Sequence, residues 1–271
     1  PTLYPHISAV DGNGEPTGYG YTLTRPETMA MLKRIHERII ERYLRPYGQT
    51  WFHLGADEVL PYYYMNENMG DRPVDPWSAA DLANHTKKEL FFRYIRELGR
   101  HLVEQGMEKV IIWHDGIHGM FGFDEEFERM LEESGLAGKI VIHWWKYNEP
   151  KLGVKDVKGA DVWVAPSTGY FPMMMYQDFL ENVEMMAEDG AEHEMKGIVS
   201  YTIYSPTQHR NTAFLAEKSW NLAAKPAEFE SRYAKWLTRS HSSDWAEGFA
   251  VMRRVFGFSP TLFLLYQLPV Y

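Results

Sequence analysis

The most constraining feature of this chain is an alternation of short apolar runs with longer amphipathic stretches, which begins near residue 26. This alternation predicts repeated βα units, because a strand covered on both faces is a continuous apolar run and the helix crossing over it keeps a polar face. Five runs have the character of strands: TWFHLGADEV, KVIIWHDG, KIVIHWWKYN, ADVWVAPSTGY and GIVSYTIYS. The sequence therefore predicts an α/β fold with a parallel sheet of five strands.

Amphipathic helices are expected beside these strands. Residues 26–43 place Met29, Leu32 and Ile35 on one face, and Pro26 suits a first helical turn. A helix is expected over residues 77–105, with Ser78 as a candidate N-cap and Gly106 closing it. An acidic helix over 124–134 and a Met-rich helix around 176–189 complete the pattern.

Five strands are too few for a closed eight-stranded barrel, in which every strand edge must be paired. Two explanations stay open: PHISAV, residues 5–10, supplies part of an earlier strand, or the first third of the barrel lies upstream. We expect residues 1–224 to form the catalytic portion of a (β/α)8 TIM-type barrel. The pattern turns helical after that, so residues 225–271 are expected to form a C-terminal helical appendage.

Composition excludes several classes of function. The formal net charge is −9 and no stripe of Lys or Arg is present, which argues against a nucleic-acid partner. The chain has no cysteine, and therefore no disulfide, thiolate metal site or thiol nucleophile. No apolar stretch is long enough to cross a membrane and the first residues do not resemble a signal peptide, so we expect a soluble protein and slightly favour the cytoplasm over secretion.

Aromatic and acidic side chains gather where the predicted strands end. In a parallel α/β sheet the carboxyl ends of the strands face the ligand. The candidates are His53, Asp57 and Glu58; Trp113, His114 and Asp115; His143, Trp144 and Trp145; Ser167 and Tyr170; and Tyr201 and Tyr204. A pocket with Trp and Tyr walls and a few carboxylates suits the flat face of a pyranose ring.

Asp57 and Glu58 are adjacent carboxylates after a strand, and neighbouring loop residues point in different directions. One can therefore address the leaving oxygen while the other addresses a second group. The charge of Asp57 would also disfavour ionisation of Glu58, which keeps that carboxyl protonated for general acid catalysis. The plainer interpretation is a surface pair or a helix N-terminal pair, which the position at a strand end after Gly55 makes less favoured.

The segment HLGADEV, His53 to Val59, resembles the signature of glycoside hydrolase family 20, the β-N-acetylhexosaminidases. The resemblance extends over roughly residues 20 to 222 and implies retaining, substrate-assisted hydrolysis, in which the 2-acetamido oxygen of the substrate is the nucleophile. It implies that Asp57 polarises the acetamido N–H, and that Glu58 protonates the departing oxygen and later deprotonates water. It also implies an N-acetylhexosamine-containing glycan as the partner. We expect no cofactor and no metal.

The family also has a Tyr that donates to the acetamido oxygen, followed two residues later by an Asp that binds sugar hydroxyls. Tyr176 and Asp178 have that spacing, and Tyr170 competes with Tyr176 for the same role. Among the tryptophans we favour Trp113 and one of Trp144 and Trp145, because consecutive strand residues face opposite sides. His53 is expected to support the carboxylate loop more than to act directly, and Asp115 and Tyr204 complete the candidate substrate-binding residues.

The chain departs from the family pattern in two places. The last strand reads YTIYSP, residues 201–206, where the family carries a Trp, one further residue and then Glu or Asp. The early arginine that grips the sugar hydroxyls has no counterpart. Both departures leave the choice between N-acetylglucosamine and N-acetylgalactosamine open.

Two other functions and one assembly stay open. A metal-dependent barrel hydrolase would use residues among His53, His114, His118, His143, Asp57 and Asp115. The tight His-x-His of such barrels is missing, however. A non-catalytic glycan-binding barrel would use the same aromatic pocket. A homodimer is also left open.

Overall fold

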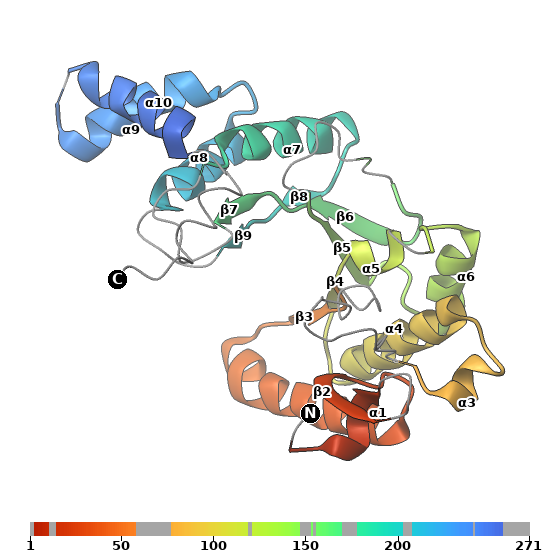
Figure 1. Cartoon of the computed structure of the whole chain (residues 1–271). Coiled ribbons are helices and arrows are strands. Elements are labelled where there is room, and N and C mark those ends of the chain that lie inside the picture. Colours follow the sequence, from red (N-terminus) through yellow and green to blue (C-terminus); the bar gives the residue numbers. More distant parts are fainter. Residues whose placement is uncertain are drawn as a thin grey trace, which may run out of the picture. The chain divides into compact units, whose positions relative to one another are not determined.

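The computed structural model describes residues 3–10, 15–57, 77–118, 121–146, 153, 156–169, 178–202, 208–240 and 242–256. Within this part the chain is an α/β protein whose main sheet has five strands in the order β3-β4-β5-β6-β8 (Figure 1). The strands are β3 Trp51–Gly55, β4 Lys109–Trp113, β5 Ile140–Trp144, β6 Ala160–Val164 and β8 Gly197–Ile198. Strand β3 pairs in parallel with β4, and β6 pairs in parallel with β8. Each of the five predicted strand segments contributes one strand to this sheet, and the α/β class is confirmed.

The chain divides into two compact units. The first contains Pro1–Ile142 and Val157–Asp161, and the second contains His143–Asp156 and Val162–Tyr271. None of the helices in the described residues is long and apolar enough to cross a membrane.

The first unit begins with a small antiparallel hairpin. A 3-10 turn, η1 Pro5–Ile7, leads into β1 Ser8–Val10, which pairs with β2 Pro16–Tyr21 in a two-stranded sheet of its own. PHISAV does contain a strand, but the idea that it supplies an earlier barrel strand is wrong for these residues. The physical reason is that its backbone hydrogen bonds are made with β2, in antiparallel register, and not with the five-stranded sheet.

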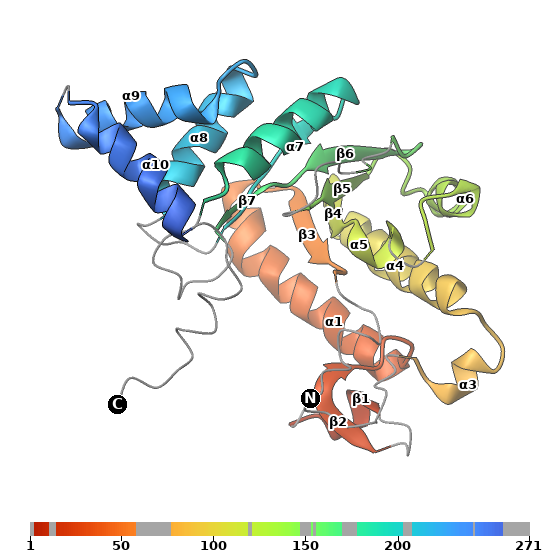
Figure 2. The same cartoon turned by 45° about the horizontal axis from the view of Figure 1, so that its top comes forward.

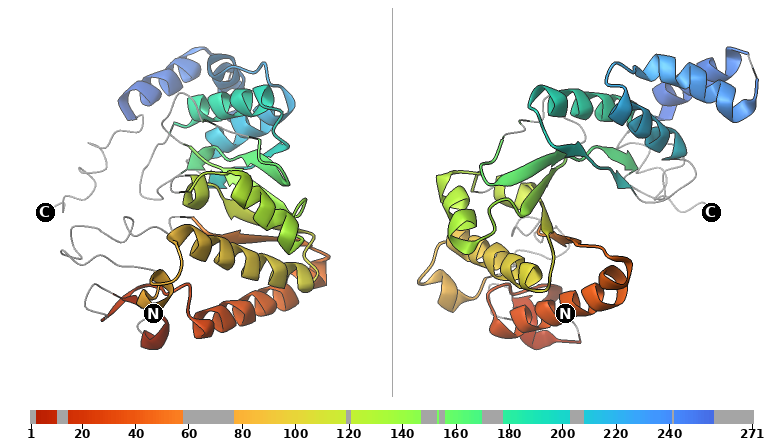
Figure 3. Two further views of the ribbon diagram at one scale, coloured as in Figure 1. Left: turned by 90° about the vertical axis from the view of Figure 1, so that its right-hand side faces the viewer. Right: turned by 180° about the vertical axis from the view of Figure 1, so that it is seen from behind.

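The first unit contains the long helix α4 and several shorter helical elements. The elements are α1 Pro26–Ile39, η2 Ile40–Leu44, η3 Arg45–Tyr47, α3 Ala79–Leu82, α4 Lys87–Glu104, α5 Asp115–His118 and α6 Glu125–Ser134. Helix α4 contacts β3 and β4, with α1 and α6 beside it (Figure 3). Leu90, Ile95 and Leu98 of α4 are buried, which accounts for the apolar periodicity of this stretch.

The single helix predicted over residues 77–105 is two helices. Ser78 accepts a hydrogen bond from the Asp81 backbone at 3.1 Å and so caps the short α3. Helix α4 starts later, at a capping box in which Thr86 and Glu89 exchange hydrogen bonds between side chain and backbone. The predicted end is confirmed, because Gly106 adopts a left-handed conformation with φ of 93°.

Among its described residues, the second unit contains most of β6, the strand β8, a short parallel sheet and four helices. Strand β7 Ser167–Gly169 pairs with β9 Tyr201–Thr202. The helices are α7 Leu180–Glu192, α8 His209–Trp220, α9 Pro226–Thr238 and α10 Asp244–Phe256 (Figure 2). The predicted strand ADVWVAPSTGY is therefore divided into β6 and β7. Pro166 lies at the break and has no N–H for a sheet ladder.

Helix α9 shares a hydrophobic core with α7 and α8. Leu180 and Val183 of α7 contact Phe214 of α8, and Phe229 and Tyr233 of α9 belong to the same buried cluster. The two rings of Phe214 and Phe229 lie 5.0 Å apart between centroids. Helix α9, which begins directly after residue 225, therefore packs within this unit. The expectation that residues 225–271 form a separate helical appendage stays a prediction.

Candidate active site

The loop after β3 holds Asp57 in a constrained backbone. Gly55 has φ of 85° and Ala56 has φ of 69°, so two consecutive residues adopt the left-handed region just before the carboxylate. A residue other than glycine rarely adopts this region, and such conformations persist only where the surroundings enforce them. The turn ends the strand and leaves Asp57 exposed. A small residue at position 56 suits this geometry.

His53 supports this loop through its backbone. Its Nδ1 accepts a hydrogen bond from the Gly55 N–H at 3.0 Å, and its ring lies 4.7 Å from the ring of Trp113 on the neighbouring strand. Partial burial lowers the pKa of His53, and the nearby charge of Asp57 opposes that shift. The neutral imidazole is therefore favoured, with the Nδ1 lone pair available to the loop. This contact agrees with the expected supporting role, which stays a prediction.

The loop after β4 packs directly on the loop after β3. Asp115 starts the short helix α5, and Gly116 follows it. A Cβ placed on Gly116 would lie 2.6 Å from the Ala56 carbonyl oxygen and 3.0 Å from the Phe91 ring. Only glycine permits this approach of the two backbones. The structure therefore brings together His53, Asp57 and Trp113, and it places Asp115 on the loop that contacts theirs.

Tyr21 is a residue near Asp57 that sequence reasoning missed. It ends strand β2, and its hydroxyl is hydrogen-bonded to Tyr94 of α4. Burial raises the pKa of Tyr21, and the charge of Asp57 adds to that increase. A neutral phenol thus lies in the electrostatic field of the candidate carboxylate. No local signal could reveal it, since Tyr21 precedes the motif by more than thirty residues in a separate hairpin.

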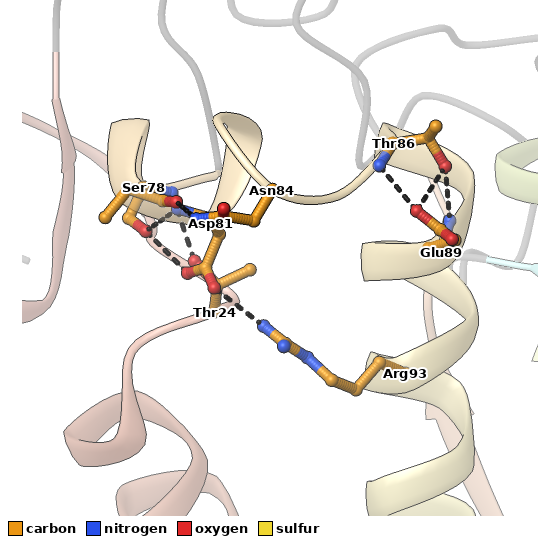
Figure 4. A network of polar contacts seen from close by, with 8 residues as sticks. Thr24, Ser78, Asp81, Asn84, Thr86, Glu89 and Arg93 are labelled. Atoms are coloured by element: carbon orange, nitrogen blue, oxygen red, sulfur yellow. Dashed lines mark hydrogen bonds and ion pairs between the residues drawn. The ribbon is translucent and has the colours of Figure 1, made fainter.

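A polar network lies around Ser78 and Asp81, directly after Trp77 (Figure 4). The Ser78 N–H donates to Thr24 Oγ1 at 3.0 Å, and Arg93 of α4 donates to Asp81 Oδ1 at 3.2 Å. The hydrogen bond from Ser78 is the main cause that lowers the pKa of Asp81, and hydrogen bonds from Thr24 and Arg93 lower it further. Residues 78–81 are therefore linked both to Thr24 and to α4.

Three of the predicted substrate-binding residues, Trp144, Trp145 and Asp178, are described by the structure in the second unit. Trp144 is the last residue of β5 and is fully buried, whereas Trp145 follows the end of the strand and is half-buried, so the expected alternation of strand residues does not apply to this pair. Asp178 precedes α7, with only 7% of its side chain exposed, and it pairs with Arg210 at 3.1 Å. Its predicted role as a sugar ligand is not tested by this contact.

Four predicted site residues, Glu58, Tyr170, Tyr176 and Tyr204, lie outside the described residues. Their assignments therefore stay predictions. Of the histidines considered for a metal site, His114 is buried with its ring 5.7 Å from that of His118. The part of the chain that the structure describes contains no group of three His, Cys, Asp or Glu side chains arranged to hold a metal ion.

Comparison with known proteins decides the family. A model of the glycosyl hydrolase family 20 catalytic domain matches residues 5–236. The chain belongs to glycosyl hydrolase family 20. This family 20 chain is thus a glycoside hydrolase of the β-hexosaminidase type, and the HLGADEV motif lies within the matched residues.

Other comparisons add little to this assignment. No curated protein matches the family 20 chain. Among solved structures, a sugar phosphate isomerase/epimerase from Parabacteroides distasonis ATCC 8503 is similar with a TM-score of 0.30 and 11% identity, over 74% of this chain and 94% of that one. A similarity of that size carries no argument about the function.

Proposed function

We propose that this chain is a retaining exo-β-N-acetylhexosaminidase, which removes terminal N-acetylglucosamine or N-acetylgalactosamine from glycans by substrate-assisted catalysis. The observation that carries the proposal is the position of Asp57. It follows the left-handed Gly55–Ala56 turn at the carboxyl end of β3, within the family motif and beside His53 and Trp113. We further propose that the five-stranded sheet is part of a (β/α)8 barrel, the fold of family 20 catalytic domains.

In the proposed reaction the acetamido carbonyl oxygen attacks the anomeric carbon and closes an oxazolinium ring. The glycosidic C–O bond breaks, and Glu58 gives its proton to the departing oxygen. Asp57 accepts a hydrogen bond from the acetamido N–H, which increases the negative charge on the attacking oxygen. Glu58 then removes a proton from the water that opens the ring. Because the nucleophile is attached to the sugar, its orientation supplies much of the rate.

The remaining residues are assigned to substrate binding. Trp113 is proposed to stack on the sugar, with Trp145 favoured over the fully buried Trp144 because it keeps exposed surface. Tyr170 and Tyr176 stay equal candidates for the acetamido contact. Asp178 is proposed to bind a sugar hydroxyl, and Asp115 and Tyr204 are further candidates at strand ends.

Substrate chemistry tests the proposed nucleophile. Trifluorination of the acetyl group weakens the carbonyl oxygen as a nucleophile with little change of shape, so hydrolysis should slow with each added fluorine. The plain glucoside lacks the acetamido group and should hardly react. An enzyme with a protein nucleophile would tolerate fluorination and form a covalent glycosyl adduct. Detection by mass spectrometry of such an adduct on Asp57, Asp115 or Asp178 would overturn the proposal.

A further inference from the structure

A buried guanidinium holds the carboxylate of Asp178. Oδ1 of Asp178 accepts a hydrogen bond from the Leu180 N–H at 3.1 Å and lies 3.1 Å from Nη2 of Arg210 on α8. Only 4% of the Arg210 side chain and 7% of the Asp178 side chain are exposed. Burial of a carboxylate without a charged partner is costly, so the ion pair with Arg210 offsets the cost of burying Asp178 in this position.

Glu230 of α9 holds Arg210 from another side. Nη1 of Arg210 donates directly to Oε1 of Glu230, whose side chain is 3% exposed. The guanidinium is planar and contacts the two carboxylates through different nitrogens, so its plane and its distance from Asp178 are both restricted. Helix α9 therefore contributes to the orientation of a residue that precedes α7.

The backbone around Asp178 is held separately by Asn211. Its Nδ2 donates to the Thr168 carbonyl at 3.1 Å, and its Oδ1 accepts from the Phe179 N–H at 3.3 Å. Asn211 is fully buried. The main chain next to Asp178 thus has an anchor that does not involve Arg210. A change at Arg210 should therefore displace the Asp178 carboxylate more than its backbone.

We propose that Arg210 is a positioning residue that aims the Asp178 carboxylate at a sugar hydroxyl, and that Glu230 fixes Arg210 for this purpose. The inference rests on the proposed function, since it takes a hexosamine as the ligand of Asp178. Arg210 itself does not touch the sugar. Its effect should appear only through the hydroxyl that Asp178 binds.

The test is a double-mutant-type cycle, which combines the substitution Arg210→Lys in the protein with the removal of single hydroxyls from the sugar. Calorimetry would measure the binding of N-acetylglucosamine and of its 3-, 4- and 6-deoxy analogues to the 271-residue wild type and to the variant. A hydrogen bond to a charged group supports about tenfold in affinity, so Arg210→Lys should weaken N-acetylglucosamine about tenfold. For the one deoxy analogue that lacks the hydroxyl bound by Asp178, the same substitution should lower the affinity by less than about twofold.

Arg232→Lys is the matched control. Arg232 of α9 pairs with Glu217 of α8, between the same two helices, but 52% of its side chain is exposed. The Arg232→Lys variant should bind N-acetylglucosamine and the three deoxy analogues with affinities within about twofold of wild type. Should Arg210→Lys fail to fold by circular dichroism, Glu230→Gln replaces it and should show the same pattern with a smaller loss.

Two results would overturn the positioning role. One is an equal loss for N-acetylglucosamine and every deoxy analogue, which indicates a structural role alone; the other is unchanged affinity in a folded variant. Both are distinct from failure of the proposed function. That failure would appear in the wild type, as binding or hydrolysis that does not depend on the acetamido group.

Discussion

Substitution of Gly116 by alanine tests whether the two loops at the strand ends support catalysis together. The added Cβ would lie 2.6 Å from the Ala56 carbonyl oxygen, whereas real Cβ contacts essentially never fall under 3.0 Å. The difference between these two distances means that the loops must move apart by at least about 0.4 Å. The Ala56 carbonyl belongs to the peptide that leads directly to Asp57, so the displacement reaches the candidate carboxylate.

The expected size of the effect follows from this geometry. A displacement of about 1 Å in a reacting group can cost about a hundredfold in rate, so a shift of half that size should lower kcat/KM by roughly tenfold. The ring of the buried Phe91, 3.0 Å from the new methyl, adds overpacking in the core of the first unit. Overpacking of this kind destabilises by about 1–3 kcal/mol.

The assay combines kinetics with stability. Gly116→Ala would be compared with wild type in hydrolysis of an aryl N-acetylglucosaminide, in affinity for a thiazoline that mimics the cyclised intermediate, and in urea denaturation. Gly99→Ala is the control, because its Cβ would meet only the flexible side chain of Leu136, at 3.0 Å. It should change stability without changing kcat/KM.

Unaltered kcat/KM in folded Gly116→Ala protein would refute the coupling of the two loops. A comparable loss of activity in Gly99→Ala would also refute it, because destabilisation of the unit would then explain the result.

Three further predictions concern single side chains. Burial, and then the charge of His101, lower the pKa of His36 from 6.5 to about 4, so the unfolded chain takes the proton first. Stability should be full above pH 6.5 and fall towards pH 4, with urea denaturation losing up to about 2 kcal/mol between pH 7 and 5 and His36→Gln removing most of that loss. Glu58→Gln should slow natural glycosides by roughly two to four orders of magnitude and activated aryl glycosides less, and equal losses in single-turnover kinetics would remove Glu58 from the acid role. Asp57→Asn should keep the fold and weaken thiazoline inhibitors, so unchanged inhibition would mean that Asp57 does not face the acetamido group.

Much of the fold could be predicted because it depends on local patterns. Short apolar runs located all five strands of the main sheet, and Gly106 marked the end of α4. The division of residues 77–105 into two helices was missed although its signal, the Thr86–Glu89 capping box, is present in the sequence. The division at Pro166 had a signal too, since proline interrupts a sheet ladder.

The candidate site was predictable only in part. His53 and Asp57 belong to one short motif, so their neighbourhood follows from chain connectivity. The ring contact of His53 with Trp113 also follows from the parallel pairing of β3 with β4, in which His53 lies beside Ile111. Tyr21 could not be predicted, because nothing in a separate hairpin indicates that its hydroxyl lies near Asp57.

By itself the sequence determined the α/β class, the order of the elements and the family motif, since these depend on periodicities and spacings within about ten residues. Tertiary structure alone decided that the Ala56 carbonyl rests on Gly116, and that Asp178, Arg210 and Glu230 share one buried cluster. These groups are 20 to 60 positions apart in the chain. Their contacts arise from how helices and strands pack. A charged side chain needs an ion-pair partner only after packing has removed the water around it.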